Sequence, residues 1–326
     1  MIARDLREAI GKALAAAGLA PADPGLRPTG VPGQYASSVA LATPGSAKTL
    51  AAQLAAEPWI ACAGITGPGY LTVTVTPQAL AALPGRIAAA GQACAASGAL
   101  RGVTVTAPPP GDPLGAATWE EARQALAAHV TARLAAAAGA TVGGGATVRS
   151  GERGAEPDAT RPRTEVAAAV AYAGADAVRF ALARAVPGRP VRIDPAVVAR
   201  HVPDNPAYAV RYAHARAASG VRWAATPNAA GAARPCPPAD PGELALLDAL
   251  SWLPERVAVA ARRARPDEFA RYLEELAGLS VAALIAASRR GSARAPGSNE
   301  LALASAVRAS LAAGLGLLGV GAPDRL

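Results

Sequence analysis

Two arginines and a histidine share one stripe of a predicted helix over residues 206–225. Arg211, His214 and Arg222 recur at helical spacing, so their side chains project from one side of that helix. Guanidinium groups bind phosphates, and imidazole rings stack on bases or bond to their edges, which is how proteins read unpaired RNA loops. The pattern fits such a contact and fits a solvated helix face equally well. His214 is also compatible with a hydrogen-bonded structural histidine.

An aromatic stripe runs beside these residues on the same predicted helix. It contains Tyr208, Tyr212, Ser219 and Trp223. A stripe at this spacing usually faces the hydrophobic core, so we expect these side chains to be buried. Stacking against unpaired bases is the alternative that we retain.

Positive charge is concentrated in the same half of the chain. The net charge is +8, and residues 161–326 hold 21 basic and 14 acidic side chains, which places seven of the eight charges there. A basic half of an otherwise neutral protein points to a polyanionic partner. A second basic cluster, for which a solvated surface is the favoured interpretation, comprises Arg256, Arg262, Arg263 and Arg265.

Several classes of protein do not fit this sequence. Cys62, Cys94 and Cys236 are scattered, so they predict neither a disulfide framework nor a CxxC metal pair. Residues 1–5 are charged, unlike a signal peptide, and the uncharged run over 58–85 contains Pro, Gly and Thr, unlike a spanning helix. We therefore expect a cytoplasmic protein with no metal, no cofactor and no membrane contact.

Composition favours a mainly α fold. Aromatic residues make up 4% of the 326 residues, and Ala accounts for much of the 52% hydrophobic fraction. Helices packed closely through Ala and Leu are therefore expected rather than a large sheet. The length suggests about two domains.

Residues 1–100 are predicted to form a small α+β domain. Alternation of apolar residues with Thr predicts one strand over 69–75, and a Pro/Gly loop is expected over 21–33. Helices are expected over 4–17, 37–41, 47–57 and 79–96.

Residues 101–163 are predicted to form a strand over 102–106, a Pro-rich turn and a helix over 119–138. Thr118 and Glu121 have the spacing of a capping box at the start of that helix. The Gly-rich stretch 139–163 is predicted to be a linker, and it is no phosphate loop because no Lys-Ser/Thr follows its glycines. Residues 164–326 are predicted to form an all-α bundle with helices near 164–185, 206–225, 242–264, 267–288 and 299–313.

The bundle carries a recognisable motif. Residues 204–216 read DNPAYAVRYAHAR, which resembles the DNPxYxVQYAHAR signature of the anticodon-binding domain of arginyl-tRNA synthetases. The segment GADAVRF at 174–180 resembles the GxDAxR segment of this DALR domain, and residues 271–277 and 317–326 resemble its last two helices and C-terminus. The resemblance implies that 164–326 is a DALR anticodon-binding helical bundle. It also implies a set of tRNA-binding residues: Tyr208, Arg211, Tyr212, His214, Arg216 and Arg222.

Two departures from the family pattern lie in the bundle. The family has Gln where Arg211 stands, which adds a positive charge near the expected anticodon stem. Where the family usually has aromatic residues, this chain has Leu279, Ser280 and Val281, which removes stacking groups and weakens the case for strict anticodon discrimination.

The N-terminal part resembles the same family independently. Residues 33–41 read GQYASSVAL, which is similar to the GDYATNVAL motif, and residues 67–71 read GPGYL, which is similar to the GPGF(I/L)N strand. The resemblance implies that 1–100 is the synthetase's N-terminal-like domain, which contacts the tRNA elbow through Tyr70 and Gln34. Gln34 and Ser38 replace the Asp and Asn of the family motif.

The catalytic elements of the family are missing from this sequence. A class I synthetase uses an HxGH element to hold ATP phosphates and a KMSKS lysine to neutralise charge during adenylate formation. The three histidines, at 129, 201 and 214, include no pair three apart, and both lysines lie before residue 49. Residues 101–163 thus resemble a short strand–helix remnant of the catalytic domain followed by a linker, and no enzyme activity is expected.

Three functions follow from these observations. The leading hypothesis is a non-catalytic relative of arginyl-tRNA synthetase that binds tRNA or a tRNA-like RNA. The second is a regulatory partner of full-length arginyl-tRNA synthetase that uses the same helical bundle as its docking surface. The third, residual arginine-tRNA ligase activity, is disfavoured by the missing catalytic elements.

Overall fold

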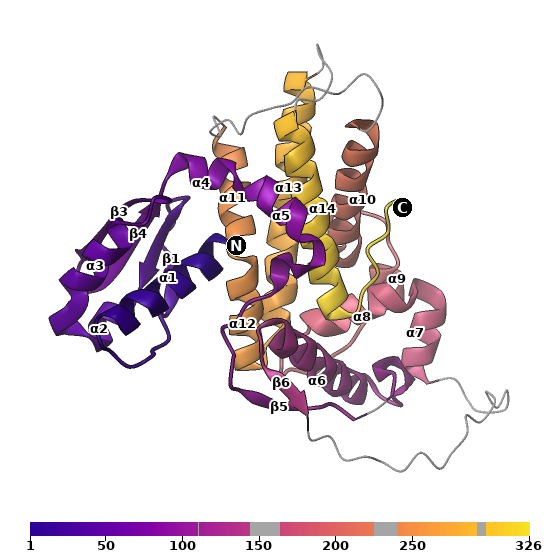
Figure 1. Cartoon of the computed structure of the whole chain (residues 1–326). Helices are drawn as coiled ribbons and strands as arrows, with labels where there is room; N and C mark the ends of the chain where they lie inside the picture. The colour runs from indigo at the N-terminus through magenta and orange to yellow at the C-terminus, as the bar shows by residue number, and fades with distance from the viewer. Residues whose placement is uncertain (110, 144–163, 225–239, 292–297) are drawn as a thin grey trace. The chain divides into compact units, whose positions relative to one another are not determined.

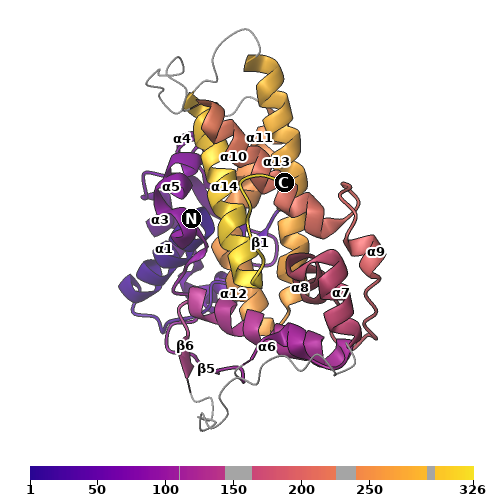
Figure 2. The same cartoon turned by 90° about the vertical axis from the view of Figure 1, so that its right-hand side faces the viewer.

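The computed structural model describes residues 1–109, 111–143, 164–224, 240–291 and 298–326 (Figures 1 and 2). These residues gather into two compact units, each built from separate stretches of chain. The first unit contains Met1–Cys94, Arg216–Glu255 and Leu279–Ser310. The second unit contains Ala95–Ala215, Arg256–Gly278 and Leu311–Leu326. The fold is mainly helical, as composition predicted.

A four-stranded antiparallel sheet forms the N-terminal part of the first unit. Its strand order is β1-β2-β4-β3. The strands are β1 (Leu26–Pro28), β2 (Gln34–Ser37), β3 (Ile60–Thr66) and β4 (Tyr70–Val75). Of these strands only β4 was predicted, because its sequence alternates apolar residues with Thr over six positions, with Leu71, Val73 and Val75 buried between half-buried Tyr70, Thr72 and Thr74. The predicted loop over 21–33 contains β1, and the predicted helix over 37–41 begins at the last residue of β2.

Helices cover the buried face of this sheet. Figure 1 shows α1 (Ile2–Ala16) and α3 (Ala47–Ala55) beside each other on the sheet, with the short α2 (Val39–Ala42) at one end. The buried residues of α1 include Leu6, Ile10 and Leu14, spaced by four as the sequence predicted. The predicted helix over 79–96 is divided into α4 (Pro77–Ala81), α5 (Leu83–Ala90) and a 3-10 segment (Gly91–Ala95).

The first unit is completed by stretches from the second half of the chain, which include α11 (Pro241–Ser251) and the first residues of α12 (Leu253–Arg263). The predicted helix over 242–264 is two helices, α11 and α12. Pro254 accounts for the break, because proline has no N–H to donate and its ring clashes with the carbonyl four residues back. Trp252 at the break is buried, and its ring centroid lies 5.0 Å from that of Tyr35 on β2.

A parallel strand–helix–strand segment begins the second unit. Strand β5 (Thr104–Thr106) pairs in parallel with β6 (Thr141–Gly143), and α6 (Trp119–Ala137) connects them. The capping box between Thr118 and Glu121 is confirmed. The prediction of a linker over 139–163 is wrong for residues 141–143, which form β6, and residues 144–163 lie outside the described part of the chain.

Helices make up the rest of the second unit. The predicted helix over 164–185 bends by 120° at Gly174, which has a φ of 86° and separates α7 (Glu165–Ala173) from α8 (Ala175–Arg184). Figure 2 shows α6, α7 and α8 grouped together. The remaining helices are α9 (Pro195–Val198), α10 (Pro206–Ala224), α13 (Pro266–Gly291) and α14 (Ser298–Leu318), of which α10, α13 and α14 contribute residues to both units.

One described helix has the length and apolarity of a membrane span. Over Asn299–Leu318 the mean hydropathy is 1.7, and 56% of the most apolar window is buried inside the protein. The buried residues on this helix include Leu303, Val307 and Leu311, which pack into the helical core. Core burial accounts for the apolar character of α14.

Candidate functional site

Three aromatic rings form a stacked column on the second unit. The ring centroids of Tyr208 and Tyr212 are 5.8 Å apart with an interplanar angle of 22°. The ring centroid of His201 lies 5.3 Å from that of Tyr208, with an interplanar angle of 13°. His201 and Tyr212 are exposed, and Tyr208, in the middle, is half-buried. We call His201, Tyr208 and Tyr212 the aromatic column.

The prediction that the aromatic stripe of this helix faces the core is wrong. Tyr212 is 37% exposed and Trp223 is 71% exposed, and Ser219 is exposed as well. The core-facing side of α10 is instead formed by Ala207, Val210, Ala213 and Ala217. In this Ala-rich chain, small residues allow the helices to pack closely, so the large rings remain at the surface.

Arg211 lies next to the column on α10 and is held by an acidic residue. Its Nη2 is 3.7 Å from Oδ2 of Asp176 on α8, with the arginine side chain 26% exposed. The other carboxylate oxygen of Asp176 accepts a 3.1 Å hydrogen bond from the backbone N–H of Gly321. The Nε of Arg211 has no hydrogen-bond partner among the described residues. The ion pair with Asp176 therefore orients the guanidinium, whereas Nε is buried and out of reach of a ligand.

His214 is a structural residue, which corrects its assignment to the tRNA-binding set. Its side chain is 2% exposed, and Nδ1 lies 2.9 Å from the carbonyl oxygen of Pro323. Because a carbonyl only accepts, Nδ1 donates this hydrogen bond. A histidine enclosed in this way presents neither a ring face nor a free edge to RNA. The alternative of a satisfied structural histidine is the one that fits.

The two remaining basic candidates lie farther along α10, in the stretch assigned to the first unit. Arg216 is half-buried, and its Nε has no hydrogen-bond partner among the described residues. Arg222 is exposed. The assignment of both arginines to the tRNA-binding set stays a prediction.

The second basic cluster is engaged in contacts inside the second unit. Arg256 lies over the ring of Tyr272, with 5.8 Å between its Cζ and the ring centroid. Arg263 pairs with Glu268 at 3.3 Å, and Arg265 pairs with Asp267 at 2.7 Å. These contacts neutralise part of the cluster's charge and agree with the surface interpretation favoured for it.

Asp267 organises this cluster. Its side chain is fully buried, and it accepts hydrogen bonds from Arg265 (2.7 Å) and from Nη1 of Arg271 (2.6 Å). Burial alone would raise the pKa of Asp267, but the hydrogen bonds from the two arginines outweigh burial and lower it. The carboxylate therefore stays ionised and fixes the turn between α12 and α13.

Gln34 and Tyr70 lie on the outer face of the sheet but are not neighbours there. Gln34 is paired with Thr74, to which its Nε2 donates a 3.4 Å hydrogen bond, whereas Tyr70 is paired with Thr66. Tyr70 and Thr74 are four residues apart on one strand, which is roughly 13 Å. Both predicted residues are half-buried on a face that also carries Thr72. They can contact one ligand only if that ligand spans the sheet.

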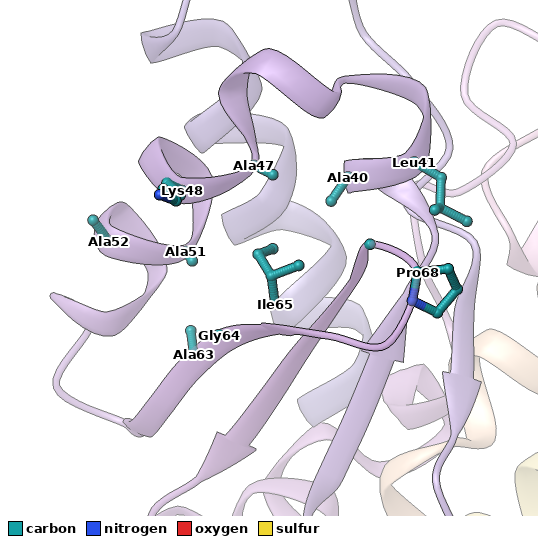
Figure 3. Close-up of a pocket in the computed structure, with 11 residues that line it drawn as sticks. Ala40, Leu41, Ala47, Lys48, Ala51, Ala52, Ala63, Gly64, Ile65 and Pro68 are labelled. Carbon is teal, nitrogen blue, oxygen red and sulfur yellow. The ribbon is translucent and has the colours of Figure 1, made fainter.

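A mostly apolar cavity of about 690 Å³ lies on the helix-covered side of the same sheet. Figure 3 shows Ile65 at the end of β3 pointing between α2 and α3, with Leu41 and Pro68 at one side and Lys48 supplying the single charge. Leu41 is 43% exposed and Ile65 is 39% exposed. Neither Gln34 nor Tyr70 lines this cavity. No group of His, Cys, Asp and Glu able to hold a metal ion occurs within the described ranges.

His201 is the site residue that sequence reasoning missed. It lies in the loop before α10, outside the helical periodicity that marked Tyr208 and Tyr212. A histidine seven residues before the first tyrosine carries no helical signal, because the loop conformation determines where its ring lies.

Comparison with known proteins identifies one domain family. Residues 210–326 match the DALR anticodon binding domain, which agrees with the resemblance inferred for the larger range 164–326. No curated protein matches the chain significantly.

Two solved structures are similar to parts of the chain. A candidate arginyl-tRNA synthetase from Campylobacter jejuni is 20% identical with a TM-score of 0.43, over 50% of this chain and 36% of its own length. The Thermus thermophilus arginyl-tRNA synthetase is 22% identical with a TM-score of 0.43, over 69% of this chain and 34% of its own length. The chain thus covers about a third of each of these proteins.

Proposed function

Because residues 210–326 match the DALR anticodon binding domain, we propose that the protein binds tRNA or a tRNA-like RNA. The family match is the observation that carries this proposal. The exposed ring of Tyr212, stacked on half-buried Tyr208 with the oriented guanidinium of Arg211 beside them, supports it. Aromatic rings and arginines are the groups that bind unpaired bases and phosphates in RNA loops.

In this proposal the two predicted binding domains contact different parts of the RNA. Residues 164–326 receive the anticodon arm, and residues 1–100 receive the elbow through the sheet face that carries Tyr70 and Gln34. Residues 101–163 connect them. The basic excess of 161–326 supports placing the anticodon arm there, because phosphate neutralisation supplies much of RNA affinity.

We further propose that the protein binds RNA without aminoacylating it, in the cytoplasm. The sequence has no HxGH or KMSKS element. His129, the histidine of the strand–helix remnant, lies on α6 with its Nδ1 2.8 Å from the carbonyl oxygen of Ala125. Arginine-dependent ATP–pyrophosphate exchange should be at background, and clear turnover would refute this part of the proposal.

A filter-binding assay tests RNA binding directly. We expect unfractionated tRNA to bind at low salt with a Kd of about 1 µM or below, more tightly than an unrelated RNA duplex, and with strong salt dependence. Equal affinity for tRNA and duplex, with no binding near micromolar concentration, would refute the function.

One feature favours a second candidate function, docking on full-length arginyl-tRNA synthetase. The cavity between α2, α3 and β3 is lined mostly by apolar side chains, with exposed Leu41 and Ile65 at its walls (Figure 3). Exposed apolar surface of this kind suits a protein partner better than RNA. Co-purification of the synthetase that survives RNase treatment would support docking, and its loss after RNase would favour RNA binding.

A further inference from the structure

The aromatic column extends one ring beyond the recognisable motif. The motif contains Tyr208 and Tyr212, whereas His201 precedes both the motif and the matched range 210–326. We propose that His201 is a base-stacking residue of the RNA site, whose outer ring face receives an unpaired base. This inference rests on the proposed RNA-binding function.

The order of the rings determines which faces are available. Tyr208 is stacked against both His201 and Tyr212, and it is the half-buried ring of the three. His201 and Tyr212, which each have one ring neighbour in the column, are therefore the rings on which a base can stack. Both end residues are exposed to solvent, as this role requires.

The chemistry of the column selects single-stranded RNA. In a duplex, the faces of each base are covered by its neighbours, whereas unpaired loop bases expose a face that can stack on a protein ring. Arg200 is exposed directly before His201, and Arg211 lies on α10 between Tyr208 and Tyr212 in the sequence. These cations suit the phosphates that flank stacked bases.

Asn205 is the positioning residue for His201. Its Nδ2 donates hydrogen bonds to the carbonyl oxygens of Val198 and Arg200, both at 2.7 Å. Its Oδ1 accepts a 3.2 Å hydrogen bond from the backbone N–H of Ala207, in the first turn of α10. Asn205 is 6% exposed, so these bonds are shielded from water. The buried side chain of Asn205 thus joins two segments, the loop with His201 and the helix with Tyr208.

Substitution of His201 tests the stacking role. The probe is an RNA hairpin whose loop carries an arginine anticodon, with the fluorescent base aminopurine in the loop. We expect His201→Ala to weaken binding by about 5- to 20-fold and to reduce quenching of the probe, whereas His201→Phe retains both within about twofold. Because stacking releases no counterions, the salt dependence of binding should not change. Tyr172→Ala, which removes a 68% exposed ring on α7 outside the column, is the matched control and should bind normally.

A double-mutant cycle tests the positioning role of Asn205. Asn205→Ser keeps a side-chain oxygen at the start of α10, but its hydroxyl is too short to reach the two loop carbonyls. If Asn205 acts through His201, Asn205→Ser should weaken binding by about 3- to 10-fold in the natural protein and by less than about twofold in the His201→Ala variant. Additive losses would overturn the positioning role.

The outcomes separate this inference from the proposed function. Failure of the natural protein to bind the hairpin or unfractionated tRNA would refute RNA binding itself. Weakened binding after Tyr212→Ala, together with unchanged binding and quenching after His201→Ala, would overturn only the assignment of His201. Loss of binding in His201→Phe as well as His201→Ala, with an unchanged melting temperature, would also overturn it, because stacking does not require the imidazole nitrogens.

Discussion

Arg7 and Glu255 form a two-bond ion pair inside the first unit, although 248 residues separate them in the chain. Arg7 Nε donates to Glu255 Oε2 at 3.1 Å, and Arg7 Nη2 donates to Oε1 at 2.6 Å. The side chains are 13% and 6% exposed. The pair joins α1 to the first turn of α12. Because each charge has an opposite charge as its hydrogen-bond partner, both side chains can be buried at these positions.

Removal of one partner should destabilise the first unit strongly. Arg7→Ala leaves the Glu255 carboxylate buried without its main partner, and the expected loss is about 3 kcal/mol of unfolding free energy. Urea denaturation followed by circular dichroism measures it. Arg4→Ala is the control, because Arg4 pairs with Asp5 and Glu8 on its own helix, and it should cost less than about 1 kcal/mol. Equal effects of the two variants would contradict this account.

Asp267 should make stability dependent on acidic pH. Its pKa is lowered in the folded state below the ordinary value of 3.8, so its stabilising contribution is complete above that value and is lost as pH falls through the folded-state pKa. Asp267→Asn should cost about 1–3 kcal/mol at neutral pH and progressively less as the pH falls from 3.8 through the lower folded-state pKa. Thermal denaturation across this range is the measurement. A constant difference between the two proteins at every pH would exclude the ionised carboxylate as the cause.

Ala264 has a left-handed backbone, with φ of 51°, in the turn between α12 and α13. This conformation costs an alanine about 1–2 kcal/mol, whereas glycine adopts it freely. Ala264→Gly should therefore stabilise the protein by about 0.5 kcal/mol after the larger chain entropy of unfolded glycine is included. Ala128→Gly, at an exposed position inside α6, should instead destabilise by about 1 kcal/mol. We expect Ala264→Gly to raise the melting temperature and Ala128→Gly to lower it.

Arg211→Gln should reduce the salt dependence of RNA binding, with a smaller effect on folding stability. Each phosphate contact by an arginine contributes roughly 0.7 to the slope of log Kd against log salt for single strands. We expect the slope to fall by about this amount in a titration with unfractionated tRNA. Arg179→Gln is the control, since Arg179 pairs with Asp112 at 3.2 Å and has no assigned role in binding. An unchanged slope in Arg211→Gln would remove this arginine from the RNA interface.

The helical half of the fold was predictable because its signals are local. The start of α10 at Pro206, the capping box of α6 and the spacing of buried residues on α1 all depend on residues within a few turns of one another. Strands β1, β2 and β3 were missed because they are short or lack alternation. Tyr35, for example, is buried by Ser251 and Trp252, which lie more than 200 residues away.

The candidate site was predictable only in part, for a similar reason. Helical spacing identified Tyr208, Tyr212 and Arg211, but it could not determine which stripe of α10 faces the core. His214 was assigned to the surface because its partner, the carbonyl oxygen of Pro323, lies 109 residues away. His201 was missed because its ring is placed by a loop that Asn205 holds through two backbone carbonyls.

The interleaved composition of the first unit constrains the order in which the chain can fold during synthesis. Tyr35 and Arg7 leave the ribosome early, but Ser251 and Glu255 follow more than 200 residues later. At an elongation rate of about 5–20 residues per second, Tyr35 and Arg7 wait at least roughly ten seconds for these partners. During this interval the surface that they will bury stays open, so the nascent chain avoids aggregation by binding a chaperone or by remaining loosely packed.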